Sequence, residues 1–184
     1  MAQTRVLAIL GSLRQASYNT ALVNTLNVLA PDDVEIVVYQ KLVEIPLFNP
    51  DLEERLSKAV VDLKSELVKS NGLIIASPEY AHGITGVLKN ALDWLVSGEE
   101  FVYMPVALFN TSPRATHAQA ALREVITTMS GRIIEKASIN IPLLGSNLNT
   151  DAILHNEDMV SLVKSSLIDF SKAIRTICDD KQAT

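Results

Sequence analysis

The sequence has few of the residues that cross-links and metal sites require. It contains one cysteine, Cys178, and three histidines that lie far apart. A single cysteine cannot form a disulfide within the chain, and Cys178 lies on a helical pattern that favours a small apolar side chain over a catalytic thiol. His82, His117 and His155 belong to no recognisable ligand motif, so we predict no metal site.

Positive charge and long hydrophobic runs are also scarce. The formal net charge is -5, which argues against nonspecific binding of nucleic acid, because the phosphate backbone attracts a basic surface. No apolar run approaches the roughly 20 residues that a membrane-spanning helix needs. The first residues have neither the length nor the cleavage pattern of a secretory signal, so we expect a cytoplasmic protein with no membrane partner.

The composition is otherwise that of a folded globular protein. Of the 184 residues, 48% are hydrophobic and 20% are charged, and no Gly/Ser-rich linker or shift in composition divides the chain. A chain of this length can bury a substantial core. We therefore expect one domain over residues 1–184.

Strand-like and helix-like patterns alternate along the whole chain. Short apolar runs predict strands, and apolar residues at helical spacing predict helices in the segments between them. The expected strands cover 6–10, 34–38, 73–76, 106–109 and a segment within 133–141, and the expected helices cover 19–29, 56–67, 87–95, 118–129 and 160–177. Gly131 follows the fourth helix as its expected C-terminal cap, and residues 141–156, which have little periodicity, are expected to cover a pocket or a neighbouring subunit.

This alternation predicts an α/β fold. Strands without polar alternation are buried on both faces, and intervening helices indicate parallel strands joined by right-handed crossovers. The expected structure is a three-layer, doubly wound domain. In such sheets ligands bind beyond the carboxyl ends of the strands, which here are followed by residues 11–19, 77–85 and 110–114.

The run GSLRQASYN, residues 11–19, has the composition of a phosphate-binding loop. It joins the first strand to the first helix, where unpaired backbone N–H groups and the helix dipole attract an anion. Gly11 permits a close turn, Ser12 and Ser17 offer hydroxyls, Asn19 offers an amide and Arg14 offers a guanidinium. Ordinary helix capping by Ser and Asn is the alternative interpretation. The run lacks both the GxxxxGK[ST] and the GxGxxG spacing, which argues against adenine-nucleotide sites of those types.

Together with SPEYAHGITGVLKNALDW at 77–94, this run resembles the NADPH-dependent FMN reductase family of flavodoxin-like quinone, azo-dye and chromate reductases. The resemblance implies a five-stranded sheet of order 2-1-3-4-5, bound FMN, and NADPH or NADH as the electron donor. It also implies a homodimer or homotetramer, in which the helix over 86–96 would build an interface.

Carried over by position, the family pattern assigns the FMN phosphate to Ser12, Arg14, Ser17 and Asn19, with Gly11 in the same loop. The flavin ring would lie beside Pro78, Glu79, Tyr80, Ala81, His82 and Gly83, with Ser112 of TSPRA at its border. Tyr80 is the candidate catalytic residue, as a side chain that lines the substrate pocket. Arg114 is a residue of the flavin border or, equally, a surface or interface residue.

The chain departs from many relatives after PEY. Those relatives have Asn, Gly and Ser there and a proline before GVLKN, whereas this chain has Ala81, His82, Gly83 and Thr85. Backbone N–H groups can still serve the flavin carbonyls, and Thr85 is expected to cap the following helix. We expect Trp94 to pack in the core or at an interface rather than on the flavin.

The resemblance predicts an oxidoreductase that passes a hydride from NAD(P)H to FMN and then electrons to a quinone, free flavin, azo compound or metal oxyanion by a ping-pong mechanism. Without a second nucleotide motif, donor and acceptor would use one site in turn. A flavodoxin-type electron carrier and an FMN-binding redox sensor without turnover are the alternatives.

Overall fold

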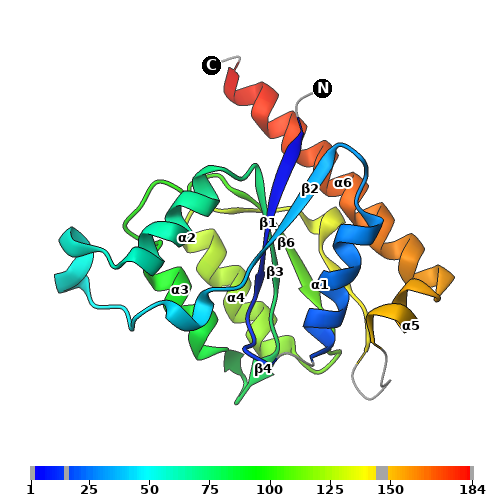
Figure 1. The fold of residues 1–184 in the computed structure, drawn as a ribbon, viewed down its shortest axis with the longest axis horizontal. Coiled ribbons are helices and arrows are strands. Elements are labelled where there is room, and N and C mark those ends of the chain that lie inside the picture. The colour runs from blue at the N-terminus through cyan, green and yellow to red at the C-terminus, as the bar shows by residue number, and fades with distance from the viewer. Residues whose placement is uncertain (1–2, 15–16, 144–148, 183–184) are drawn as a thin grey trace.

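The computed structural model describes residues 3–14, 17–143 and 149–182 of the chain. Its centre is a parallel sheet with helices on both sides (Figure 1). The longer strands are β1 (Thr4–Leu10), β2 (Val34–Tyr39), which lies at the edge of the sheet, β3 (Gly72–Ala76) and β6 (Pro105–Asn110). The short strands β7 (Arg132–Ile133) and β8 (Ile139–Asn140) both pair with β6. The order β2-β1-β3-β6-β7 confirms the predicted α/β fold and, with β7 and β8 sharing the fifth position, the predicted order 2-1-3-4-5.

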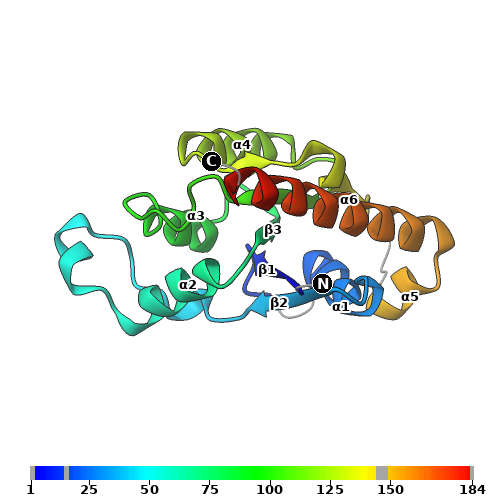
Figure 2. The same ribbon diagram turned by 90° about the horizontal axis from the view of Figure 1, so that it is seen from above.

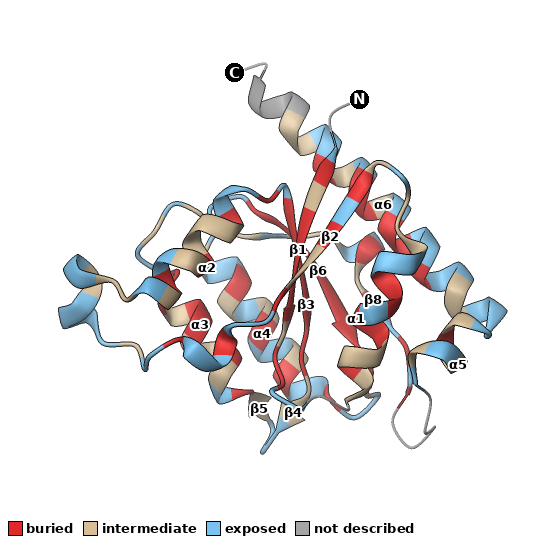
Figure 3. Cartoon of the chain, viewed as in Figure 1, coloured by how far each residue is buried: buried red, intermediate tan, exposed pale blue. Residues whose placement is uncertain are grey.

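The strands are apolar because the sheet is covered on both faces. Every residue of β3 and β6 is buried (Figure 3). Alternate side chains enter two separate cores: Leu73 and Ile75 of β3 point into one, and Ile74 points into the other. This two-sided burial is the physical reason why the strands show no polar alternation.

Three helices cover each face of the sheet (Figure 2). Helices α1 (Tyr18–Leu29), α5 (Thr150–Leu154) and α6 (Glu157–Gln182) lie on one side, and α2 (Lys58–Val68), α3 (Gly86–Asp93) and α4 (Thr116–Thr128) lie on the other. Apart from α5, each begins within a few residues of its predicted position. No helix among the described residues is long and apolar enough to span a membrane.

The fifth strand differs from the prediction. One strand within 133–141 is expected, but the 3-10 helix η3 (Glu135–Ala137) separates β7 from β8. Across this interruption the Ser138 hydroxyl accepts a hydrogen bond from the backbone N–H of Leu108, at 3.1 Å. A side chain thus replaces the backbone carbonyl that a continuous strand would offer to β6. Residues 141–156, expected to be irregular, include α5, and residues 144–148 lie outside the described residues.

The end of α4 corrects the expectation for Gly131. Ser130, one residue earlier, takes the left-handed conformation, with φ 61, and its N–H donates to the carbonyl of Thr127 at 2.9 Å. The Gly131 N–H donates to the carbonyl of Ile126, which completes a Schellman-type cap. Gly131 is required for space instead, because an added Cβ would lie 2.7 Å from the Phe101 ring.

Trp94 packs in the core, as predicted. Its side chain is buried, its Nε1–H donates to the carbonyl of Pro46 at 2.8 Å, and its ring meets the edge of Phe48 at a centroid distance of 5.1 Å. These contacts anchor the base of a projecting segment that contains the 3-10 helix η2 (Pro50–Arg55) (Figure 2). The preceding 3-10 helix η1 (Leu42–Glu44) packs against α3.

Candidate active site

The loop after β1 leads into the first turn of α1 at the carboxyl edge of the sheet. Ser17 is the N-cap of α1, and its hydroxyl accepts a hydrogen bond from the N–H of Thr20 at 3.0 Å. The Thr20 hydroxyl in turn lies 2.8 Å from Ser17 Oγ and 3.3 Å from the carbonyl of Arg14. Helix capping therefore engages the Ser17 hydroxyl, while the first-turn N–H groups retain the positive end of the helix dipole.

Gly11 allows the loops after β1 and β3 to meet. A Cβ on Gly11 would lie 2.2 Å from Ser77 Oγ, so no other residue fits without a shift of the chain. The Thr85 hydroxyl donates to the carbonyl of Gly11 at 2.5 Å. Thr85 does occupy the N-cap position of α3, but it makes no side-chain capping bond, which corrects the predicted cap: its hydroxyl joins the two loops instead.

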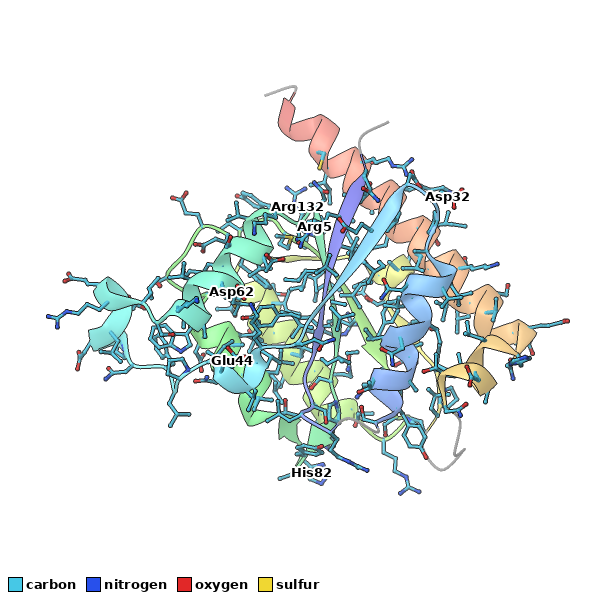
Figure 4. All side chains as sticks on the ribbon, in the orientation of Figure 1. Arg5, Asp32, Glu44, Asp62, His82 and Arg132 are labelled. Carbon is cyan, nitrogen blue, oxygen red and sulfur yellow. The ribbon has the colours of Figure 1, made fainter. Side chains whose placement is uncertain are left out.

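The segment after β3 forms a small hairpin from β4 (Glu79–Tyr80) and β5 (Gly83–Ile84). Its two central residues, Ala81 and His82, both have positive φ, 49 and 59, as in a type I′ turn. Figure 4 shows His82 at the outer edge of the molecule, beyond the carboxyl ends of the strands. The sequence pattern did not predict this hairpin.

Glu79 connects the hairpin to α4. One carboxylate oxygen accepts a hydrogen bond from the backbone N–H of Ala118 at 2.8 Å, and the other lies 3.1 Å from Nδ1 of His82. The Ala118 N–H and, secondarily, His82 hold the pKa of Glu79 below its usual value. The His82 ring also packs edge-on against His117, at a centroid distance of 4.7 Å.

The loops enclose a cavity of about 740 Å³, within the range of small-molecule and cofactor sites. Eight predicted site residues line it: Ser12, Arg14, Ser17, Asn19, Pro78, Glu79, Tyr80 and Ser112. Gly11 instead lines an adjoining cavity of about 450 Å³, which shares Ser12, Arg14 and Tyr80 with the first. Ala81, His82 and Gly83 line neither cavity.

Several lining residues lie outside the predicted set. They are Tyr18, Thr20, Ala21, Asn24, Thr111, Ala115, Asn149 and Thr150, together with Arg114, which the sequence left between a border and a surface position. Thr111, Arg114 and Ala115 belong to the TSPRA run at 111–115, which was a usable signal. Asn149 and Thr150 belong to residues 141–156, which were expected to cover a pocket or a neighbouring subunit, although no motif singled out these two residues.

The cavity favours an anionic ligand. Arg14 and Arg114 are exposed at its edge, and neither forms an ion pair with any part of the chain that the structure describes. The acidic lining residue, Glu79, is already hydrogen-bonded to α4 and His82. Two free guanidinium groups and a helix N-terminus therefore set the local potential.

Residues 4–143 match the model of a protein family described as NADPH-dependent FMN reductase. The chain belongs to this family. It is therefore an oxidoreductase that uses FMN and NAD(P)H, and the family resemblance of the two motifs is confirmed.

The names of similar proteins agree with this family assignment. The quinone reductase of Escherichia coli K12 is 30% identical over 139 residues, which cover 72% of this chain and 74% of that protein. An NAD(P)H-dependent FMN reductase of Pseudomonas aeruginosa is 28% identical over 169 residues, covering 89% and 91%. The structure of FerB, a flavoenzyme NAD(P)H:(acceptor) oxidoreductase from Paracoccus denitrificans, superimposes with a TM-score of 0.72 at 24% identity, covering 92% of this chain and 98% of that chain, and supports the fold.

The hydrogen-bond donors that line the cavity fit FMN. A phosphate needs hydrogen-bond donors and positive charge, and Ser12, Asn19, Arg14 and the start of α1 offer both on one side of the cavity. The uncharged part of a flavin needs a flatter, less polar surface, which Pro78 and Tyr80 of the β3 loop provide. The cavity thus has chemically distinct walls for the two parts of the cofactor.

Proposed function

We propose that this chain is an NAD(P)H-dependent FMN reductase whose acceptor is a quinone, free flavin, azo compound or metal oxyanion. The observation that carries the proposal is the cavity in which the phosphate-type loop and the β4–β5 hairpin meet. Relatives named for quinone, flavin and azo reduction support this range of acceptors.

The proposed site residues have separate roles. Ser12, Arg14, Ser17 and Asn19, with Gly11 shaping the loop, bind the cofactor phosphate. Pro78, Glu79, Tyr80 and Ser112, which line the cavity, border the ring. Ala81, His82 and Gly83 shape the hairpin that carries Glu79 and Tyr80. FMN, when bound there, would take up the hydride of NAD(P)H and give the two electrons to the acceptor. The chain holds the ring, orients the substrates and limits water, while Tyr80, at the wall that the two cavities share, lines the substrate pocket.

We further propose a ping-pong order, in which oxidised NAD(P)⁺ leaves before the acceptor enters. The sequence has no GxGxxG motif for a separate dinucleotide site, so donor and acceptor would occupy the space beside Tyr80 in turn. Steady-state rates measured at several NADPH and quinone concentrations should give parallel double-reciprocal lines. Intersecting lines would instead require both substrates to be bound together.

The phosphate assignment can be tested by binding. Arg14→Ala combined with Ser17→Ala should weaken FMN binding by about tenfold or more, because the loop loses a charged donor to the phosphate and the cap that orders the start of α1. Quenching of flavin fluorescence measures the affinity, and Arg55→Ala, at an exposed arginine on η2, is the matched control. An unchanged FMN affinity in the double variant would contradict the assignment.

Anaerobic addition of NADPH to the FMN-loaded protein tests the enzyme against the two alternatives. We expect the visible flavin absorption to bleach and then recover when a quinone is added. A protein that binds FMN but is not bleached by NADPH would be an electron carrier or a redox sensor.

We also propose that one domain over 1–184 assembles as a homodimer or homotetramer. Apolar side chains of η1 and of the projecting segment that follows it, Val43, Leu47 and Leu52, are exposed, which favours contact with another protein surface. Light scattering coupled to size-exclusion chromatography would give the mass, and a monomer at micromolar concentration would refute this assembly.

A further inference from the structure

A buried hydrogen bond joins two walls of the cavity. The Thr111 hydroxyl, just beyond β6, lies 2.9 Å from Oδ1 of Asn19 in the first turn of α1, although the residues are 92 positions apart. Asn19 is 3% exposed and Thr111 is 5% exposed. Both residues line the cavity.

The chemistry of the two groups fixes the orientation of the Asn19 amide. A buried hydroxyl needs an acceptor for its proton, and the described residues offer the Thr111 hydroxyl no acceptor except Asn19 Oδ1. The amide nitrogen only donates, so it cannot take that place. The carbonyl oxygen of Asn19 therefore faces Thr111 and the NH₂ group faces away from it.

The Asn19 NH₂ group is left available for a ligand. It has no hydrogen-bond partner among the described residues, and it is not sealed from the cavity, since no fully enclosed polar side-chain atom in the described part of the chain lacks a partner. A nearly buried donor with no protein partner at a ligand cavity is expected to serve the ligand.

Thr111 is itself held firmly. Its carbonyl accepts a hydrogen bond from the N–H of Leu143 at 3.0 Å, and the next N–H, of Ser112, donates to Oδ1 of Asn110 at 3.0 Å. The backbone on both sides of the Thr111 side chain is thus fixed to the end of the sheet. A rigid hydroxyl can set the direction of a neighbouring amide.

We propose that Thr111 is a positioning residue that directs the Asn19 NH₂ group toward the FMN phosphate. This inference rests on the proposed function of the cavity. Without the Thr111 hydroxyl the amide is free to reverse, and its carbonyl oxygen then faces the phosphate. The site would lose a donor and gain an electrostatically unfavourable contact.

The test compares two flavins that differ in the phosphate. Thr111→Val keeps the size of the side chain and removes the hydroxyl. We expect its dissociation constant for FMN, measured by quenching of flavin fluorescence, to rise about tenfold, while binding of riboflavin changes less than about twofold. Thr111→Ser, which keeps the hydroxyl, should bind FMN like the wild type.

Two further variants separate positioning from a general effect on folding. Asn19→Asp keeps an oxygen toward Thr111 but replaces the NH₂ group with a negatively charged oxygen, so FMN binding should weaken far more than riboflavin binding. In an Asn19→Ala background, Thr111→Val should cause no further loss of FMN affinity, because the two residues act as one unit. Denaturation curves of the cofactor-free proteins identify any variant that fails to fold.

The possible results are distinct. Wild-type FMN affinity in folded Thr111→Val, or an equal loss of FMN and riboflavin, would overturn the positioning role and leave the proposed function intact. Additive losses in the Asn19→Ala background would overturn it as well. A wild-type chain that binds neither flavin would overturn the proposed function itself.

Discussion

Ala81 and His82 adopt a backbone conformation that ordinary side chains disfavour. Both have positive φ, 49 and 59, at a cost of roughly 1–2 kcal/mol per residue for a non-glycine residue. Asn-Gly is the preferred pair in such a turn. At His82 the contacts with Glu79 and His117 offset part of the cost, whereas Ala81 is exposed and its methyl group makes no comparable contact.

Ala81→Asn should therefore stabilise the protein. Asparagine tolerates positive φ better than alanine, so we expect the free energy of unfolding to increase by about 0.5–1 kcal/mol. Chemical denaturation of the cofactor-free protein measures the change. Ala120→Asn, at an exposed position within α4, is the control and should destabilise, because asparagine is a poorer helix former than alanine. Equal effects at both sites would contradict the role of the turn.

For individual polar residues, a motif can predict the position in the helix without predicting the hydrogen-bond partner of the side chain. The pattern places Ser17 and Thr85 at helix starts, and both lie there. Ser17 caps its own helix, but the Thr85 hydroxyl bonds to Gly11 from another loop. Local capping follows from neighbouring residues in the sequence, whereas a bond between distant residues depends on the packing of the whole sheet.

Among the elements, α4 begins without a local cap. Ala115 occupies its N-cap position and has no side-chain acceptor. The carboxylate of Glu79, 39 residues earlier, accepts the N–H of Ala118 instead, and its negative charge lies at the positive end of the helix. The hairpin that borders the cavity is thereby tied to α4, which packs against it.

Glu79→Ala should loosen the start of α4. The Ala118 N–H loses its acceptor, so we expect its amide hydrogen to exchange several-fold faster, together with a lower stability of the protein. Glu79→Gln, whose carbonyl can still accept, should show a smaller effect, and Glu124→Ala, on the exposed side of the same helix, should leave Ala118 unchanged. Hydrogen exchange followed by NMR would make the comparison, and unchanged protection in Glu79→Ala would refute the cap.

The elements also show which patterns carry information. The inner strands and the long helices were predictable because burial on both faces gives apolar runs and one-sided burial gives helical spacing. The paired segments β4, β5, β7 and β8 each contain two residues, too few to show any period. Their formation depends on turns and on neighbouring strands, so the sequence alone did not reveal them.

At the scale of the whole molecule, the candidate site was partly predictable because two of its loops carry contiguous motifs. The residues of 11–19 and 77–80 that line the cavity come from those loops. Thr111 comes from the third expected loop, 110–114, whereas Asn149 and Thr150 have no motif and reach the cavity where α5 packs against α1. The Asn19–Thr111 bond likewise depends on the crossover order of the strands, which no local pattern encodes.

An ion pair between the sheet and α2 makes the stability of the protein depend on pH in the acidic range. Glu66 on α2 accepts hydrogen bonds from Arg5 of β1 and from Lys69, and these bonds, with Arg5 the stronger influence, hold its pKa below the usual 4.5. A depressed folded-state pKa adds stability above the unfolded pKa, and this stability is lost as the pH falls through the folded value. We expect the free energy of unfolding to decrease below about pH 4.5, and to decrease less steeply in Glu66→Gln; parallel denaturation profiles would contradict this link.

Stability should also decrease at alkaline pH, because the folded state raises the pKa of a tyrosine instead of lowering that of a carboxylate. Burial, and then the nearby Asp62 carboxylate, raise the pKa of Tyr39 above its ordinary value of 10.0. The folded state therefore favours the neutral phenol, and its contribution is fully present below pH 10 and is lost as the pH rises toward the higher folded value. Tyr39→Phe removes the ionising hydroxyl and its 3.3 Å bond to the carbonyl of Ala59. It should lower stability slightly at neutral pH but flatten the alkaline decrease, as denaturation between pH 8 and pH 11 would measure; an equally steep decrease in Tyr39→Phe would assign the alkaline loss to other groups.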